Sequence, residues 1–208
     1  MAVVTLDETA LLQAVHALAG RDADLAGVLQ RYGPPPLWAR PPGFATLVRV
    51  ILEQQVSLAS ALAAFNRLQA AAGSLTPRAF LTFDDAALKQ FGFSRQKTRY
   101  CRLLAEALES GVLDLAELAG LEDADARRRL TALKGIGPWS ADIYLLMALR
   151  RADVWPPNDL ALRSGLARLK GLPSPLSAAD FEALGEAWRP WRSAAARLVW
   201  FDYLGGKP

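Results

Sequence analysis

The residue with the clearest potential for chemistry is Asp159, which follows Pro156-Pro157-Asn158 and precedes an apolar segment. An aspartate in this setting is typical of a helix N-cap, where a carboxylate oxygen accepts a hydrogen bond from a backbone amide. The helix dipole favours a negative charge at that end. A fixed carboxylate can also stabilise positive charge that develops in a reaction, and it can orient an attacking water. The sequence therefore predicts an N-cap that could also be catalytic.

The stretch from residue 130 to residue 142 could bind an anion through its backbone. Gly135 can adopt the left-handed conformation that ends helices, so we expect one helix to end near Lys134. Gly137-Pro138 should begin the next helix, with proline at its first position. The outward-facing amides at the positive end of that helix would suit a phosphate group. An ordinary helix–helix corner is the competing interpretation, because Gly-x-Gly alone is a common pattern.

The longer pattern is more specific than either motif. Two segments resemble the hairpin and the catalytic loop of helix-hairpin-helix DNA glycosylases. They read Leu-x-Gly-Ile-Gly-x-Trp-Ser-Ala at residues 133–141 and Pro-Pro-Asn-Asp-Leu-Ala-Leu-Arg at residues 156–163. The chain is most similar to the 3-methyladenine DNA glycosylase II (AlkA) type, in matched order from about Pro42 to Tyr203. Further segments carry the resemblance: Pro42-Gly43-Phe44, Ile51-Leu52-Glu53-Gln54-Gln55-Val56-Ser57, Gly92-Phe93-Ser94-Arg95-Gln96-Lys97 and Trp188-Arg189-Pro190-Trp191-Arg192-Ser193.

This resemblance implies an enzyme of base excision repair that flips alkylated purines, such as 3-methyladenine and 7-methylguanine, out of double-stranded DNA and hydrolyses their N-glycosidic bonds. Asp159 falls on the family's catalytic aspartate, with Asn158 beside it. Cleavage builds positive charge on the deoxyribose, which the carboxylate would stabilise. Purines alkylated at N3 or N7 already carry positive charge, so they can leave without a dedicated general acid.

The resemblance also implies a base pocket lined by Trp139 and Trp200. Their ring faces could stack on a flipped, cationic base through cation–π attraction, which predicts loose base specificity. Ile143 stands where the family has a further pocket tyrosine. We interpret the remaining tryptophans as core residues: Trp38, Trp155, Trp188 and Trp191.

Contacts with DNA are likewise implied by resemblance. Gln55 matches the wedge that fills the gap left by the flipped base, although a purely structural glutamine is an equally supported interpretation. Pro138 replaces a basic residue that is common in such hairpins, so phosphate binding depends on backbone amides. The residues expected at the DNA backbone are Gly135, Gly137, Trp139, Ser140 and Arg163, with Arg95, Lys97 and Arg99 as further candidates for phosphate contacts.

No cofactor for catalysis is implied. Related glycosylases hold a monovalent cation between the hairpin and a phosphate, and a Na⁺ or K⁺ ion here would be structural. A helix that ends at a tight glycine turn leaves backbone carbonyls without helical partners. The matching carbonyls in this chain are those of Thr131, Leu133 and Ile136.

The choice of nucleophile separates this chain from superfamily members that also cut the DNA backbone. Those members use a lysine two residues after the second hairpin glycine. Here that residue is Trp139, which predicts a monofunctional enzyme that uses water, with a bifunctional glycosylase/lyase as a minor alternative. A non-catalytic helix-hairpin-helix DNA-binding module would leave Asp159, Trp139 and Trp200 without a joint explanation, and a helical protein–protein scaffold would make the two-glycine hairpin incidental.

Composition is compatible with these expectations. The chain has 208 residues, 52% of them hydrophobic, and a formal net charge of +3 that suits a polyanionic partner without requiring one. A single cysteine, Cys101, excludes an internal disulfide and a four-cysteine metal site. Apolar runs are too short to span a membrane, and the N-terminal stretch resembles no targeting signal. We expect a monomer in a reducing, bacterial-type cytoplasm, associated with the nucleoid through DNA and with no membrane partner.

Helical spacing of apolar residues predicts an all-α fold of about ten short helices, in which Asp7 caps the first helix and Ser94 and Ser177 precede others. Two proline-rich breaks suggest two helical lobes with a cleft between them, lobe A at approximately 44–150 and lobe B at approximately 1–43 plus 151–208. The residues before Pro42 are too few, and too helical in pattern, for the mixed N-terminal sheet domain of the best-known bacterial members.

Overall fold

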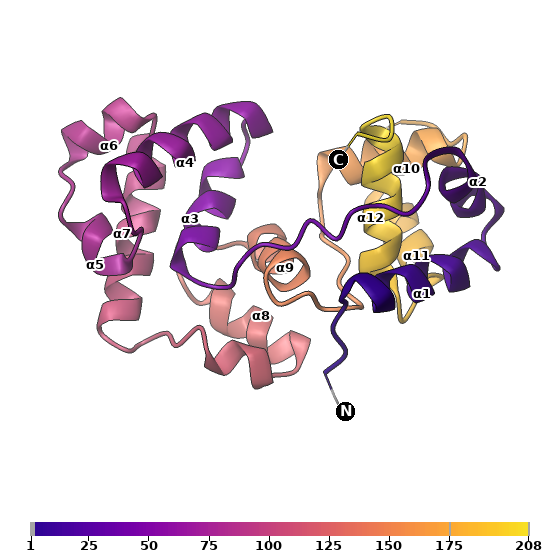
Figure 1. The fold of residues 1–208 in the computed structure, drawn as a ribbon, viewed down its shortest axis with the longest axis horizontal. Helices are drawn as coiled ribbons and strands as arrows, with labels where there is room; N and C mark the ends of the chain where they lie inside the picture. Colours follow the sequence, from indigo (N-terminus) through magenta and orange to yellow (C-terminus); the bar gives the residue numbers. More distant parts are fainter. Residues whose placement is uncertain (1–2, 175, 208) are drawn as a thin grey trace. The chain divides into compact units, whose positions relative to one another are not determined.

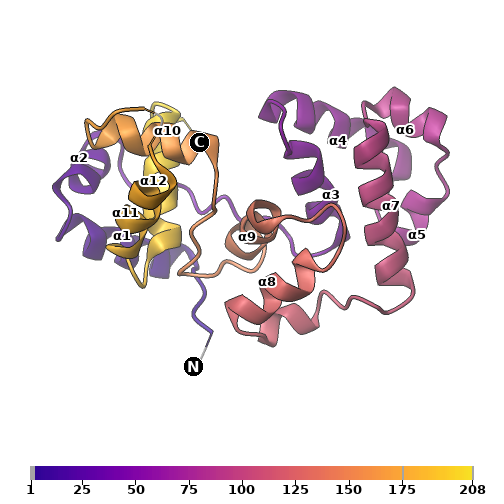
Figure 2. The ribbon, with the colours of Figure 1, turned by 180° about the vertical axis from the view of Figure 1, so that it is seen from behind.

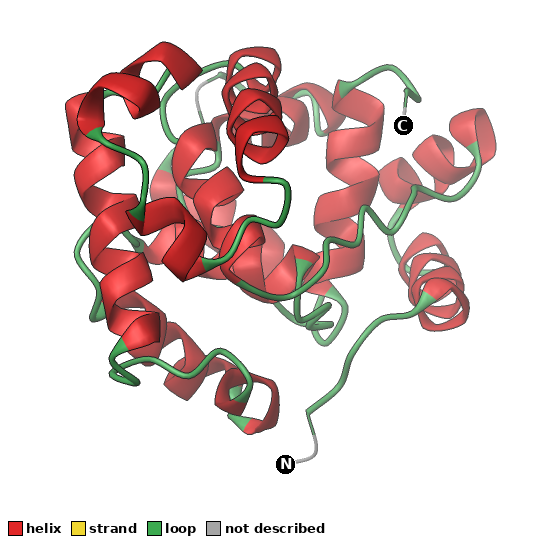
Figure 3. Cartoon of the chain, turned by 60° about the vertical axis from the view of Figure 1, so that its left-hand side comes forward, coloured by secondary structure: helices red, strands yellow, loops and turns green. Residues whose placement is uncertain are grey.

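The computed structural model describes residues 3–174 and 176–207, and within these ranges it is all-helical, with no strand. One isolated β-bridge joins Thr5 and Arg151. Among the described residues, no helix is long and apolar enough to cross a membrane. Figure 3 shows helices connected by loops throughout the chain. The sequence prediction of an all-α fold is confirmed, although the described residues form twelve α-helices and one 3-10 helix in place of about ten helices.

The chain divides into two compact units. The first combines the described residues up to Ala39 with those from Leu149 onward. Its helices are α1 (Glu8–Ala19), α2 (Ala23–Tyr32), α10 (Leu160–Leu169), α11 (Ala178–Glu186) and α12 (Arg192–Tyr203). The second runs from Arg40 to Ala148. Its helices are α3 (Phe44–Glu53), α4 (Leu58–Ala72), α5 (Pro77–Leu81), α6 (Asp85–Phe91), α7 (Arg95–Glu109), α8 (Asp123–Thr131) and α9 (Pro138–Met147), with the 3-10 helix at Glu117–Gly120.

Helix α12 forms the centre of the first unit. Every residue from Ser193 to Asp202 is buried, and α1, α2, α10 and α11 all pack on this helix (Figure 1). Trp155 stacks on Phe181 with ring centroids 4.8 Å apart, and Trp188 approaches Trp155 edge-on at 5.5 Å. Trp155 and Trp188 are therefore core residues, as the sequence predicted. Trp38 and Trp191 are only half-buried, so the prediction that they lie in the core was wrong.

Helix α3 forms the centre of the second unit, with α4, α7 and α9 packed on it (Figure 2). Its side chains from Leu47 to Ile51 are almost all buried, which explains why this helix can contact three others. The backbone amide of Gly43 donates to the buried Tyr144 hydroxyl of α9 at 3.0 Å. Burial raises the pKa of that hydroxyl above its ordinary value. The start of α3 is thus fixed against α9.

Helix caps confirm most of the expected helix starts. Side chains of Asp7, Ser94 and Ser177 accept hydrogen bonds from the amides of Ala10, Lys97 and Asp180, so each satisfies an amide that the first turn leaves unpaired. The expected helix end near Lys134 was wrong, because α8 ends at Thr131. The last turn tightens there, since the Leu133 amide donates to the Leu130 carbonyl in place of a carbonyl four residues back.

Candidate functional site

Asp159 is the N-cap of α10 and lies 8% exposed. Its Oδ1 accepts the Leu162 amide at 2.7 Å, which is the capping hydrogen bond that the sequence predicted. The same oxygen accepts the Trp200 indole N–H of α12 at 3.2 Å. The structure therefore brings together two of the sequence-predicted site residues, Asp159 and Trp200. Two hydrogen bonds, one from the first turn of α10 and one from α12, thus hold this carboxylate oxygen in place.

Close packing of α10 on α12 makes this pair possible. A Cβ at Gly165 would lie 3.1 Å from a Val199 methyl carbon and 3.2 Å from Tyr203 Cβ, tighter than most real Cβ contacts. The absent side chain at Gly165 lets the two helices approach. Asn158, just before the carboxylate, has φ +58, so the chain reverses sharply before α10 begins. Leu160, just after it, is 77% exposed.

The hairpin between α8 and α9 contains two glycines, Gly135 and Gly137, with different structural roles. Gly135 has φ +103, and a Cβ there would overlap the Tyr100 ring, 2.3 Å from its Cγ. Gly137 has φ −88, and nothing lies within 4 Å of where its Cβ would be. Gly135 is thus required by the fold, whereas only Gly137 leaves an open approach to the backbone.

Helix α9 begins at this open position. Pro138 occupies its first turn, as predicted, and Gly137 is the N-cap with no side chain to cover the helix start. Trp139 is half-buried, whereas Ser140 is 2% exposed. Trp139 and Ser140 lie with the hairpin in the second unit, while Asp159 and Trp200 lie in the first. Ile143, which the sequence resemblance matched to a pocket tyrosine, is buried.

Gln55, the sequence-predicted wedge, is an exposed residue between α3 and α4 and has φ +55. The preceding residue, Gln54, escaped the sequence analysis. Its Nε2 donates to the Gly135 carbonyl at 2.9 Å and to Ser140 Oγ at 2.8 Å. A glutamine in the middle of a motif gives no sign of a partner more than eighty residues away, so only the structure reveals this contact.

A second contact that sequence reasoning missed joins the two helices of the hairpin. Arg127 Nε of α8 donates to Asp142 Oδ1 of α9 at 2.6 Å, and Asp142 is 3% exposed. An aspartate in the middle of a mostly apolar helix was the available signal, because buried carboxylates are almost always paired. This ion pair joins α8 to α9 and so stabilises the hairpin between them.

The candidate phosphate contacts differ in how available they are. Arg95 and Arg99 are exposed on α7. Lys97 is half-buried, and its Nζ donates to the Leu52 carbonyl at the end of α3 at 2.7 Å, while burial lowers its pKa. Arg163 donates to the Leu176 carbonyl within its own unit. Lys97 and Arg163 thus stabilise the fold, which leaves Arg95 and Arg99 as the more accessible cations.

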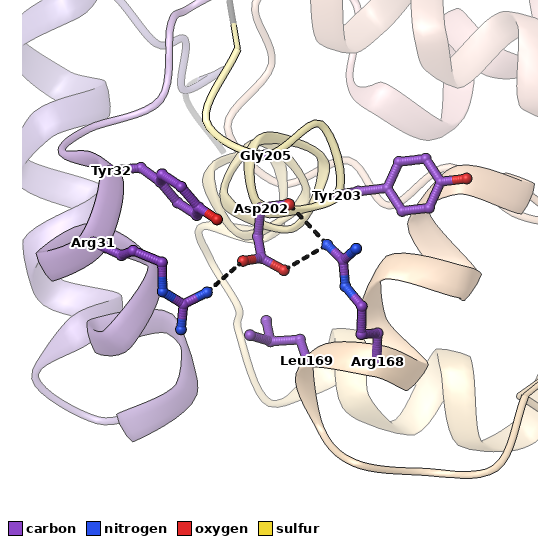
Figure 4. Close-up of a pocket in the computed structure, with 7 residues that line it drawn as sticks. All are labelled: Arg31, Tyr32, Arg168, Leu169, Asp202, Tyr203 and Gly205. Carbon is purple, nitrogen blue, oxygen red and sulfur yellow. Dashed lines mark hydrogen bonds and ion pairs between the residues drawn. The ribbon is translucent and has the colours of Figure 1, made fainter.

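A pocket of about 330 Å³ lies at the C-terminal ends of α2, α10 and α12 and contains none of the predicted site residues. Arg31 and Arg168 reach toward the buried Asp202 carboxylate from two sides, at 3.0 and 2.9 Å (Figure 4). Both cations also lie near helix C-termini, where the dipole favours positive charge. We therefore interpret this cluster as one that joins three helices.

Among the described residues, no group of three or more His, Cys, Asp or Glu side chains could hold a metal ion.

The family of HhH-GPD superfamily base excision DNA repair proteins matches residues 48–192. DNA-3-methyladenine glycosylase 1 of Schizosaccharomyces pombe is 31% identical over 92% of this chain and 87% of its own length. DNA-3-methyladenine glycosylase 2 of Escherichia coli is 29% identical over 84% of this chain and 64% of its own. A solved structure of the S. pombe 3-methyladenine DNA glycosylase in complex with abasic DNA aligns with TM-score 0.83, at 29% identity, over 91% of this chain and 95% of that one.

Proposed function

The chain belongs to the HhH-GPD superfamily of base excision DNA repair proteins, and we propose that it is a monofunctional DNA glycosylase that hydrolyses alkylated purines from DNA. The observation that carries this proposal is the buried Asp159 carboxylate, anchored by the Leu162 amide and the Trp200 indole. Two relatives are DNA-3-methyladenine glycosylases, which supports the substrate class, and we propose 3-methyladenine and 7-methylguanine as its members.

The reaction breaks one C1′–N bond of the damaged nucleotide. Positive charge develops on the deoxyribose as that bond lengthens, and the ionised Asp159 stabilises this charge. The departing base takes the bonding electron pair, which neutralises the charge of an alkylated purine. A water oxygen then bonds to C1′, and its proton passes by way of the carboxylate to solvent. The anchoring of Oδ1 holds the charge in place before the reaction starts, so no reorganisation is needed.

Recognition precedes this chemistry. We propose that the hairpin binds a DNA phosphate at Gly137 and the start of α9, and that Gln55 enters the duplex where the base leaves it. Trp139 and Trp200 would then stack on the flipped, cationic base. Trp139 also occupies the position at which bifunctional members carry their lysine, which supports hydrolysis by water. The protein is proposed to act as a monomer in a bacterial-type cytoplasm.

The decisive experiment measures base release from methylated duplex DNA. Purified protein should release 3-methyladenine and 7-methylguanine from dimethyl-sulfate-treated DNA, detected by chromatography of the free bases. Borohydride added during the reaction should trap no covalent protein–DNA adduct, because water and not an amine attacks C1′. Binding without base release would favour a non-catalytic DNA-binding module, and a trapped adduct would favour a bifunctional lyase.

Affinity for undamaged duplex DNA should fall steeply with salt. A hairpin and a few cations that neutralise roughly four to six phosphates predict a slope of about −4 to −5 in a plot of log K against log salt concentration. Fluorescence anisotropy measures this slope. The useful range is about 50 to 200 mM KCl, because the affinity of proteins for DNA changes strongly over it. A nearly flat dependence would contradict the DNA-binding proposal.

The hairpin carbonyls of Thr131, Leu133 and Ile136 are the proposed ligands of a structural Na⁺ or K⁺ ion. Uncharged oxygen donors suit a weakly bound monovalent ion, and a carbonyl has two lone pairs, so the Leu133 carbonyl can serve although it already accepts the Ile136 amide at 3.1 Å. Replacing potassium by tetramethylammonium at equal ionic strength should weaken DNA binding. Unchanged affinity would remove the ion from the proposal.

A further inference from the structure

We infer that Gln54 is a positioning residue that ties the wedge loop to the hairpin, so that the phosphate contact and the wedge act as one rigid body. This inference rests on the proposed function. Gln54 Nε2 spans two elements, with the Gly135 carbonyl 2.9 Å away in the hairpin turn and Ser140 Oγ 2.8 Å away in the first turn of α9. All of these residues lie within the second unit.

The partners fix the orientation of the Gln54 amide. A carbonyl oxygen can only accept a hydrogen bond, so the NH₂ group and not the amide oxygen must face Gly135. The two protons of that group then satisfy the Gly135 carbonyl and the Ser140 hydroxyl oxygen. Each acceptor belongs to the segment proposed to contact a phosphate. Replacement of the amide by an apolar side chain would leave the carbonyl and the nearly buried hydroxyl without this donor.

The backbone explains why the contact matters for Gln55. Gln54 caps the end of α3 in an extended conformation, with φ −62 and ψ +122, and the next residue turns to φ +55. A residue other than glycine rarely adopts the left-handed region, and it stays there when its surroundings hold it in that conformation. On the N-terminal side of Gln55, the two hydrogen bonds of Gln54 hold the backbone in this conformation. On the other side, Ser57 caps α4 through the Ser60 amide at 3.2 Å.

Tethering has a mechanical consequence for recognition. The wedge must enter the duplex at a fixed distance from the phosphate that the hairpin holds, because base pairs and phosphates are fixed relative to one another in DNA. If the loop moved independently of the hairpin, phosphate binding would not direct the wedge toward the lesion. A residue bonded to both segments couples phosphate binding to unstacking of the base.

A double-mutant cycle separates this role from simple stabilisation. The variants are Gln54→Ala, Gln55→Ala and the two combined. The readout is the fluorescence of 2-aminopurine placed opposite a tetrahydrofuran abasic site, which increases when the wedge unstacks the base. We expect Gln54→Ala to lower the rate of this increase about tenfold, while affinity for undamaged duplex changes less than about threefold. In the Gln55→Ala background, the same change should have almost no further effect, because the wedge that it positions is already gone.

Ser140→Ala provides a second variant if Gln54→Ala folds poorly. It removes one of the two acceptors and keeps the bond to the Gly135 carbonyl, so an effect of about threefold on the unstacking rate is expected. Equal effects of the Gln54 change in both backgrounds, or an equal loss of affinity for undamaged DNA, would overturn the inference. This readout needs DNA binding but no excision. A parent protein that unstacks the base without releasing methylated purines would therefore contradict the proposed function and leave the tether testable.

Discussion

Replacement of Asp159 by asparagine should reduce single-turnover base excision by roughly 10²- to 10³-fold while the protein stays folded and still binds damaged DNA. Asparagine keeps an oxygen at the position of Oδ1, so it can still accept from the Leu162 amide and the Trp200 indole. The negative charge is lost, and an NH₂ group takes the place of the second carboxylate oxygen. Because that charge acts on the developing cation and not on the intact substrate, the loss should appear in the rate of chemistry and not in affinity.

A matched control is available in Asp84, which caps α6 in the same way. Its Oδ1 accepts the Ala87 amide at 2.8 Å, and the residue is exposed. Asp84→Asn changes one charge at one N-cap and should leave excision unchanged. Excision by the Asp159→Asn protein within a few-fold of the parent would remove Asp159 from the catalytic role.

Replacement of Gly135 by alanine should destabilise the protein by about 3 kcal/mol, which combines the cost of a positive φ with overlap on the Tyr100 ring. For a chain of this size, the melting temperature should fall by roughly 6 to 12 °C. The structural basis is the 2.3 Å approach of a Cβ to Tyr100 Cγ at φ +103. Differential scanning calorimetry measures the change directly.

Gly137→Ala is the matched control within the same turn. Its φ of −88 suits alanine, and no atom lies within 4 Å of the new methyl group. Its melting temperature should therefore match that of the parent, while its affinity for duplex DNA should fall roughly tenfold for all sequences alike, because the contact is with a phosphate and not with a base. A stable Gly135→Ala protein, or full DNA affinity of Gly137→Ala, would contradict this division of roles.

Local features of the structure could be predicted from the sequence. Asp7, Ser94 and Ser177 cap their helices as expected, and Pro138 begins α9, because caps and prolines act on neighbouring residues. The end of α8 was less predictable. This helix ends four residues before Gly135, and the glycine pattern marks the turn without fixing where the helical hydrogen bonds stop.

Contacts between segments far apart in the chain could not be predicted from the sequence. The Asp159 cap was predicted, but its bond to Trp200, forty-one residues away, depends on the close approach of α10 and α12. The tether from Gln54 and the internal partners of Lys97 and Arg163 depend in the same way on how helices pack. Residue types suggested which side chains could carry charge or donate protons. They did not indicate which of those groups are already engaged within the protein.

The first unit draws its helices from both ends of the chain, and this arrangement sets the order in which the enzyme can form. Arg197 of α12 donates to the Leu37 carbonyl, a contact between residues 160 positions apart. During synthesis, α1 and α2 therefore leave the ribosome long before α12, the helix that packs on them. Their apolar faces stay uncovered until α12 has been made. The second unit, with the hairpin, has all of its residues available earlier. In a nascent chain, the residues of the hairpin are thus available before those of α10 and α12, which hold the proposed catalytic carboxylate and its indole partner.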